Sequence, residues 1–243
     1  MNSFIPKTRP RLAIVDARLG QEALARLEGL GLEVIKTIEC RELDRSISYH
    51  PDLVLHPIDG KNLVAAPNTA SYYRDKLADF GIEVRLGETS LSRKYPGDIA
   101  YNVGRIGRHY VHKRGATDPL LRESLEGEGL ELVDVKQGYS KCSLAVLGED
   151  LAITSDRPMY EKLKALGYDI LLIRPGYIDL PGQNYGFIGG CLGVLDENRI
   201  LVSGTFNEHP DQGRILEFLR VHKKEIIYLN QGGLLDIGTI IVL

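Results

Sequence analysis

A thiol and three carboxylates recur at nearly equal spacing along the chain, and such a set can bind and modify a small cation. The positions are Asp52, Asp98, Cys142 and Asp236, with Ile188 between the last two, and successive members lie 46, 44, 46 and 48 residues apart. Carboxylates gathered in a low dielectric repel one another unless a cation lies between them or their pKa values rise. A cation with several N–H donors is therefore the ligand that this set favours.

His50 and Cys142 add the groups that a covalent mechanism needs. A cysteine thiolate is a strong nucleophile near neutral pH, and Lys141 or an approaching cation lowers the pKa of such a thiol. His50 precedes Asp52 by two residues, so on a strand both side chains face one side, where the imidazole can move protons. The alternative is structural: Asp often bonds backbone N–H groups in turns, and a lone Cys is often a small buried hydrophobe. Both interpretations stay open at this point.

Three further polar residues join the predicted substrate-binding set. His56 stands at the end of the apolar run that follows Asp52, Asn102 follows Asp98 in the next motif, and His209 lies at the entry to a predicted helix. The three cysteines of the chain are widely separated, and none has CxxC or Cys/His metal-ligand spacing. We therefore expect no disulfide framework, no metal ion and no other cofactor.

An internal repeat is expected to position these residues. The motifs YHPD, YPGD, YSKC and YGFI each open a segment in which two apolar runs flank a tight polar turn, which is the pattern of a β-hairpin. A helix with Asp, Thr or Pro at its start follows each hairpin, and a short strand follows each helix. Together with one near the N-terminus, the helices are expected near 19–28, 70–80, 119–127, 157–166 and 211–221.

The two ends of the chain supply a fifth copy of this unit. Residues 11–48 give strand, helix and strand, and residues 232–243 give the first strand that this copy lacks. The other repeats span approximately 49–94, 95–138, 139–184 and 185–231, within one domain over 1–243. We expect an α/β protein built as a five-fold pseudosymmetric ββαβ propeller, closed by the N- and C-terminal strands, because closure removes exposed sheet edges.

The amino-acid composition and the net charge indicate which classes of binding partner to expect. The chain has 243 residues, 43% of them hydrophobic, and a formal net charge of −3, which suits a sizeable buried core. No cluster of Lys and Arg interleaves with aromatic residues, so neither nucleic acid nor an anionic membrane is expected. Without an apolar leader or a long apolar run, we expect a cytoplasmic protein. The expected partner is a small cationic molecule, and a homodimer is left open.

Five ββαβ units around an axis, with the last completed by both termini, resemble the pentein fold of the guanidino-group-modifying enzymes. That superfamily includes arginine and agmatine deiminases, dimethylarginine dimethylaminohydrolase and amidinotransferases. In it a His-x-Asp opens one repeat and a Cys after a glycine-containing turn opens another, as do HPD at 50–52 and GYSKC at 138–142 here. The resemblance implies attack by Cys142 on a guanidinium carbon, proton transfer by His50, and a clamp of Asp52, Asp98 and Asp236.

One position departs from the family pattern and leaves alternatives. The superfamily nucleophile lies in the last repeat as GG-x-x-Cys, whereas residues 232–236 read GGLLD. The chain is therefore either a Cys-dependent hydrolase or transferase acting on a guanidino or amidino compound, or a non-catalytic binding module. A dehydrogenase-like doubly wound sheet is a further alternative because of the opening LAIVDARLGQEALARLEGLGLEVI, although no GxGxxG follows a strand and opens a helix.

Overall fold

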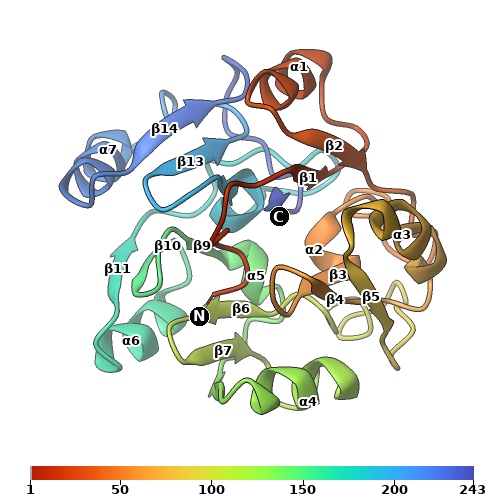
Figure 1. Ribbon diagram of the computed structural model, residues 1–243. Helices are drawn as coiled ribbons and strands as arrows, with labels where there is room; N and C mark the ends of the chain where they lie inside the picture. The colour runs from red at the N-terminus through yellow and green to blue at the C-terminus, as the bar shows by residue number, and fades with distance from the viewer. Residues whose placement is uncertain (1) are drawn as a thin grey trace.

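Five small sheets of three strands each make up the fold. A computed structural model describes residues 2–243, and the sheets lie around the middle of the molecule in Figure 1. In every sheet the middle strand pairs antiparallel with one neighbour and parallel with the other. The mixed α/β architecture of five units is thus confirmed, and the doubly wound parallel sheet is wrong.

The elements follow one another in the predicted order of strand, strand, helix and strand. The sheets are β3 (Leu55–Pro57), β4 (Asn62–Ala65) and β5 (Glu83–Leu86); β6 (Gly104–Ile106), β7 (His109–His112) and β8 (Glu131–Asp134); β9 (Leu144–Val146), β10 (Leu151–Thr154) and β11 (Asp169–Leu172); β12 (Leu192–Val194), β13 (Arg199–Val202) and β14 (Glu225–Tyr228). The fifth sheet joins the ends of the chain: β15 (Ile241–Val242) lies antiparallel to β1 (Leu12–Val15), which lies parallel to β2 (Glu33–Lys36).

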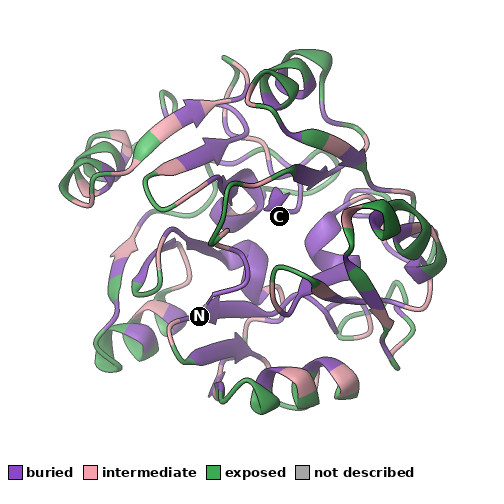
Figure 2. Cartoon of the chain, viewed as in Figure 1, coloured by how far each residue is buried: buried purple, intermediate pink, exposed green. Residues whose placement is uncertain are grey.

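The helices pack one apolar side inward and expose the other. They are α1 (Gln21–Gly29), α3 (Ala70–Leu77) with a 3-10 turn η1 (Ala78–Phe80), α4 (Pro119–Gly127), α6 (Arg157–Ala165) and α7 (Gln212–Val221), close to the predicted ranges. The buried residues of α4, α6 and α7 are four apart, as one helix face requires: Leu121 and Leu125, Met159 and Leu163, Ile215 and Leu219. Figure 2 shows exposed outer helix faces around buried inner strands.

The end of each unit's helix has a left-handed residue that turns the chain into the next strand. Gly follows four of the helices with positive φ, and Lys223 adopts φ 55° at the fifth without being a glycine. The four glycines are Gly31, Gly81, Gly129 and Gly167. None of the helices in residues 2–243 combines the length and the apolar character that crossing a bilayer requires.

Three of the motifs that open the units are single helical turns, which corrects the expectation of strands. Residues 51–54 form α2 (Pro51–Val54), residues 140–143 form α5 (Ser140–Ser143), and residues 188–191 form the 3-10 turn η2 (Ile188–Cys191). His50 is the N-cap of α2 and Asp52 lies in its first turn. The two side chains therefore share a region through a helical turn rather than through strand alternation.

Asp118 joins two neighbouring units through one buried carboxylate. It caps α4 by accepting a hydrogen bond from the Leu121 N–H at 3.0 Å, and it accepts two more from the N–H groups of Glu88 and Thr89, at 2.8 and 2.6 Å. Its side chain is fully buried. Asp156 caps α6 through the Met159 N–H at 2.8 Å but lies half-buried and makes no such link to the preceding unit.

We expect Asp118→Ala to lower the free energy of unfolding by about 3 kcal/mol. The substitution removes a helix cap and also leaves buried N–H donors without a hydrogen-bond acceptor. Asp156→Ala, the matched control, removes the cap alone and should cost about 1 kcal/mol. Urea denaturation of both variants measures the difference. Equal losses would show that the contacts between units add nothing.

Candidate active site

A cavity of about 450 Å3 brings together four of the predicted site residues. His50, Asp98, Cys142 and Asp236 all line it. They come from four different parts of the chain: the start of α2, the loop before β6, helix α5 and the loop before β15. The remaining lining residues include an aromatic group of Tyr95, Tyr139, Tyr185 and Phe187, with Asp44, Arg93 and Gln183.

Cys142 is held by two side chains that lie behind it. Its Sγ is 3.0 Å from Asp52 Oδ2 and 3.1 Å from Asn102 Nδ2. Asn102 also accepts hydrogen bonds from the backbone N–H groups of Lys141 and Cys142, at 2.9 and 3.2 Å, which fixes the first turn of α5. Asp52 and Asn102 are fully buried and are not among the residues that line the cavity.

This arrangement keeps the thiol protonated in the absence of a cation. Burial, followed by the charges of Asp52 and Asp236, raises the pKa of Cys142 well above the ordinary thiol range. Burial also raises the pKa of Asp52 to about 7, although Lys141 and the thiol hydrogen bond act in the opposite direction. The thiol therefore donates a hydrogen bond to Asp52, and the carboxylate is poised to accept the proton near neutral pH.

His50 lies between two carboxylates. Its Nδ1 is 3.8 Å from Asp236 Oδ1 and its Nε2 is 4.0 Å from Asp16 Oδ2, and Nε2 has no hydrogen-bond partner in the described chain. Burial lowers the pKa of His50, so the imidazole is neutral and can accept a proton. Asp16 is a site residue that the sequence analysis missed, although an aspartate directly after the strand LAIV was a usable signal.

Asp98 and Asp236 retain acceptor capacity toward the cavity. Tyr139 OH donates to Asp98 Oδ2 at 2.5 Å, while Asp98 Oδ1 is buried without a partner in residues 2–243. Asp236 accepts hydrogen bonds from the Phe187 and Gly238 N–H groups, at 2.8 and 3.0 Å, which aims its carboxylate. The contact made by Tyr139 was not predicted, because the tyrosines of the opening motifs were interpreted only as markers of the repeat.

Lys141 is a buried cation on the inner side of this cluster. Its Nζ donates to Thr239 Oγ1 at 2.5 Å and lies 4.9 Å from the centre of the Phe4 ring. Burial lowers the pKa of this ammonium group, although Asp52 and Cys142 act to raise it. Lys141 attracts the thiolate, but in the protein without ligand burial and carboxylate charge dominate and the net pKa of Cys142 is raised.

Besides Asp52 and Asn102, two further predicted residues lie outside the cavity. His56 Nδ1 is 3.3 Å from the Tyr101 carbonyl oxygen, its ring packs edge-on against Phe4, and burial lowers its pKa well below the usual range. His209 Nε2 lies 3.2 Å from the Arg174 carbonyl oxygen, and its Nδ1 accepts a hydrogen bond from the Asp211 N–H. Both histidines thus have structural contacts, and neither lines the cavity.

The inner cluster also has donors that suit a soft metal ion. One ligand atom each from His50, Asp52 and Cys142 lies within 4.8 Å of the others, and all three residues are buried. A thiolate, an imidazole and a carboxylate are the ligand types that Zn²⁺ takes in proteins. Such an ion would displace the thiol proton, so metal and proton compete for the same three groups.

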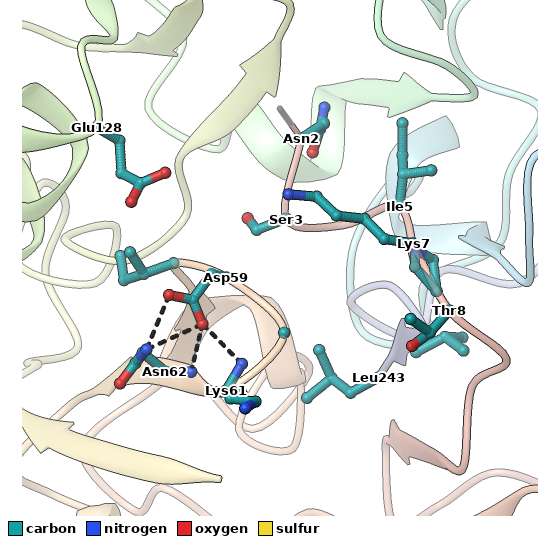
Figure 3. Close-up of a pocket in the computed structure, with 14 residues that line it drawn as sticks. Asn2, Ser3, Ile5, Lys7, Thr8, Asp59, Lys61, Asn62, Glu128 and Leu243 are labelled. Carbon is teal, nitrogen blue, oxygen red and sulfur yellow. Dashed lines mark hydrogen bonds between the residues drawn. The ribbon is translucent and has the colours of Figure 1, made fainter.

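A second cavity, of about 380 Å3, lies on the side of the N-terminal segment (Figure 3). Asn2, Ser3 and Lys7 stand on one side of it, and the turn of the β3–β4 hairpin stands on the other. Asp59 is engaged within that turn, where it accepts hydrogen bonds from the Lys61 and Asn62 N–H groups at 2.7 and 2.9 Å. We assign no chemistry to this cavity because its carboxylate at Asp59 stabilises the hairpin.

Asp52→Asn should stabilise the protein increasingly as pH rises. Folding raises the Asp52 pKa from 3.8 to about 7, so its contribution to stability is full below about pH 4 and is lost as pH rises through 7. The amide avoids this loss and can still accept the thiol hydrogen bond. Chemical denaturation should show a gain approaching roughly 4 kcal/mol above pH 7 and little gain at pH 4.

Asp44→Asn is the control with the opposite sign. Hydrogen bonds from Ser46 lower the Asp44 pKa, so that side chain stabilises the protein above its ordinary pKa and the variant should be less stable at neutral pH. A gain for Asp52→Asn that does not change between pH 4 and 8 would contradict the raised pKa.

Solved structures with the same fold are enzymes. A dimethylarginine dimethylaminohydrolase aligns with a TM-score of 0.60 and 14% identity, covering 96% of this chain and 100% of that chain. An agmatine deiminase from C. jejuni aligns with a TM-score of 0.57 and 11% identity, covering 98% and 95%. An amidinotransferase from Microseira wollei in the saxitoxin biosynthetic pathway aligns with a TM-score of 0.54 and 15% identity, covering 90% and 88%. The chain therefore has the pentein fold of these proteins.

Sequence comparison reaches a family but no characterised relative. No curated protein matches the sequence. The model of a family of unknown function, DUF6873, matches residues 14–241, which include the cysteine, histidine and aspartates described above. The chain belongs to the DUF6873 family.

Proposed function

We propose that the protein is a Cys-dependent enzyme that acts on the C–N bonds of a small guanidino or amidino compound, as a hydrolase or an amidinotransferase. The observation that carries the proposal is the pair formed by Cys142 and Asp52. Their side chains are 3.0 Å apart, and the thiol borders a cavity that is also lined by the carboxylates of Asp98 and Asp236, of which Asp98 Oδ1 has no partner in residues 2–243. The fold shared with guanidino-modifying enzymes agrees with this assignment.

The substrate cation binds between Asp98 and Asp236 in this proposal. Two carboxylates from opposite sides match the planar array of N–H donors on a guanidinium group. The four lining aromatic residues supply flat surfaces against which such a planar cation can stack. Asp52 serves as the partner of the thiol instead of joining the clamp, because it lies behind Cys142.

Binding of the substrate cation then promotes deprotonation of the Cys142 thiol. Its positive charge offsets the carboxylates that raise the Cys142 pKa, so the thiol proton passes to Asp52 and the thiolate attacks the guanidinium carbon. The tetrahedral intermediate expels an amine, which takes up the former thiol proton from Asp52 through His50 and leaves Cys142 as a thiouronium cation. Water then attacks the thiouronium carbon and the C–S bond breaks, which releases a ureido product and the thiol, while the remaining proton of the water passes to His50 and on to solvent; an acceptor amine in place of water gives a transferase.

We also propose that the five units form a closed propeller, with the nucleophile in the opening turn of the unit that begins at Tyr139. The pairing of β15 with β1 supports closure because it unites the two ends of the chain in one sheet. In such a ring the opening turns of all units converge, which accounts for the meeting of residues that follow one another at intervals of 44 to 48 positions.

One observation favours a second candidate function, a binding module without catalysis. The free thiol is protonated, and its hydrogen-bonding capacity is used by Asp52 and Asn102. A protein of this kind would hold the same guanidino or amino cation between Asp98 and Asp236 without forming a bond to Cys142.

Incubation with a panel of small guanidino compounds tests the enzyme. We expect a covalent adduct in the intact mass and release of ammonia or an amine, and we expect Cys142→Ser to abolish both. Cys191→Ser is the matched control because Cys191 is also buried but does not line the cavity. Reversible binding that survives Cys142→Ser, with no adduct or amine, would establish the binding module and contradict the enzyme.

A further inference from the structure

Three arginines line a surface hollow between the unit that contains α6 and the unit that contains α7. The boundary between two such neighbouring units is called a seam. The hollow has a volume of about 520 Å3 and is lined by residues of α6, of α7 and of the end of β11. These three elements lie on the left of Figure 1. Arg157 comes from the first position of α6, Arg174 follows β11, and Arg214 lies in the first turn of α7. None of them lines the active-site cavity.

One carboxylate, that of Asp211, accepts hydrogen bonds from two of these arginines. Asp211 is 3% exposed and accepts hydrogen bonds from the Arg174 N–H at 2.7 Å, from Arg174 Nη2 at 3.1 Å and from Arg214 Nη1 at 3.1 Å. Arg157 has no ion pair or side-chain hydrogen bond with any residue of 2–243. Three guanidinium groups against one carboxylate leave the hollow with an excess of two positive charges.

The internal repeat shows that the fold does not need these cations. Asp118 occupies the corresponding place before α4 and links its unit to the preceding one in the same way, through the Glu88 N–H. At that seam Glu88 stands where Arg174 stands here, Leu121 corresponds to Arg214, and Ala70 corresponds to Arg157. The aspartate alone makes the structural link, so the three arginines need another explanation.

The residues that line the hollow favour a ligand with an anionic group attached to an apolar organic part. The hollow is bounded by the first turns of two helices of nine and ten residues, whose N-terminal ends carry partial positive charge. The Ser155 side chain adds a hydroxyl, and Tyr160, Leu172 and Pro175 supply apolar surface. Guanidinium groups match the oxygens of a phosphoryl group through paired hydrogen bonds.

We propose that this hollow is a second ligand site, which binds a phosphate monoester through Arg157 and Arg214. The phosphoryl oxygens lie between these two guanidinium groups, and the organic part lies against Tyr160 and Pro175. Arg174 adds positive charge to the site while its hydrogen bonds to Asp211 link the two units. The site stands independently of the chemistry at Cys142, but residues 173–187 connect the two, since they carry Arg174 as well as Tyr185 and Phe187 of the active-site cavity.

Calorimetric titration with inorganic phosphate and with phenyl phosphate, at constant ionic strength, tests the site. We expect both to bind and the monoester to bind more tightly. Arg157→Gln and Arg214→Gln should each weaken binding about tenfold, the loss expected for one hydrogen bond between charged groups. Arg122→Gln on the exposed side of α4 is the matched control and should leave binding unchanged.

The contrary outcomes are equally distinct. Failure of both probes to bind would overturn the proposal, as would an equal loss of affinity in Arg122→Gln, which would indicate diffuse surface charge. The unfolding temperature of each variant shows whether the fold is retained. Arg157 makes no contact that the fold uses, so a folded Arg157→Gln variant with unchanged phosphate affinity would be decisive against the site.

Discussion

The site depends on a proton placed between the Cys142 thiol, which lines the cavity, and the Asp52 carboxylate, which is fully buried behind it. An ionised thiol and an ionised carboxylate 3.0 Å apart repel each other strongly in a low dielectric, so in the free protein the pair keeps a proton. The charged groups around the pair determine whether the proton stays on the thiol or moves to the carboxylate. Lys141 stabilises negative charge from one side, and Asp236 opposes it from the other.

The repeat explains how such a cluster forms in a small chain. Asp98, Cys142 and Asp236 stand at the same position in three of the units and line one cavity, and Asp52 at that position in a fourth unit lies directly behind Cys142. The approach is close enough to require glycine: a side chain at Gly190 would overlap the Asp236 carboxylate, and one at Gly238 would overlap His50. Asn102 then fixes the start of α5 through two backbone N–H groups, which orients Cys142 without a contribution from solvent.

Periodicity predicted the elements of the fold well, because helix caps, glycine stops and hairpin turns are local signals. The meeting of His50, Asp98, Cys142 and Asp236 also followed from their equal spacing. The direction of the Cys142 pKa shift did not, because it depends on burial and on which carboxylate lies behind the sulfur. His56 and His209 were included for their residue type, and only tertiary contacts with Phe4 and Arg174 reveal their structural surroundings.

In the proposed mechanism a bound guanidino cation, and no group among residues 2–243, ionises Cys142. The direct measurement is a titration of the thiolate ultraviolet absorbance, as the difference between the wild-type protein and Cys142→Ser, with and without a saturating guanidino compound. The account predicts a pKa above the ordinary thiol range in the free protein and a marked fall on binding, with no fall for a neutral urea analogue. A thiol already ionised at neutral pH without ligand, or a pKa that the cation leaves unchanged, would contradict it.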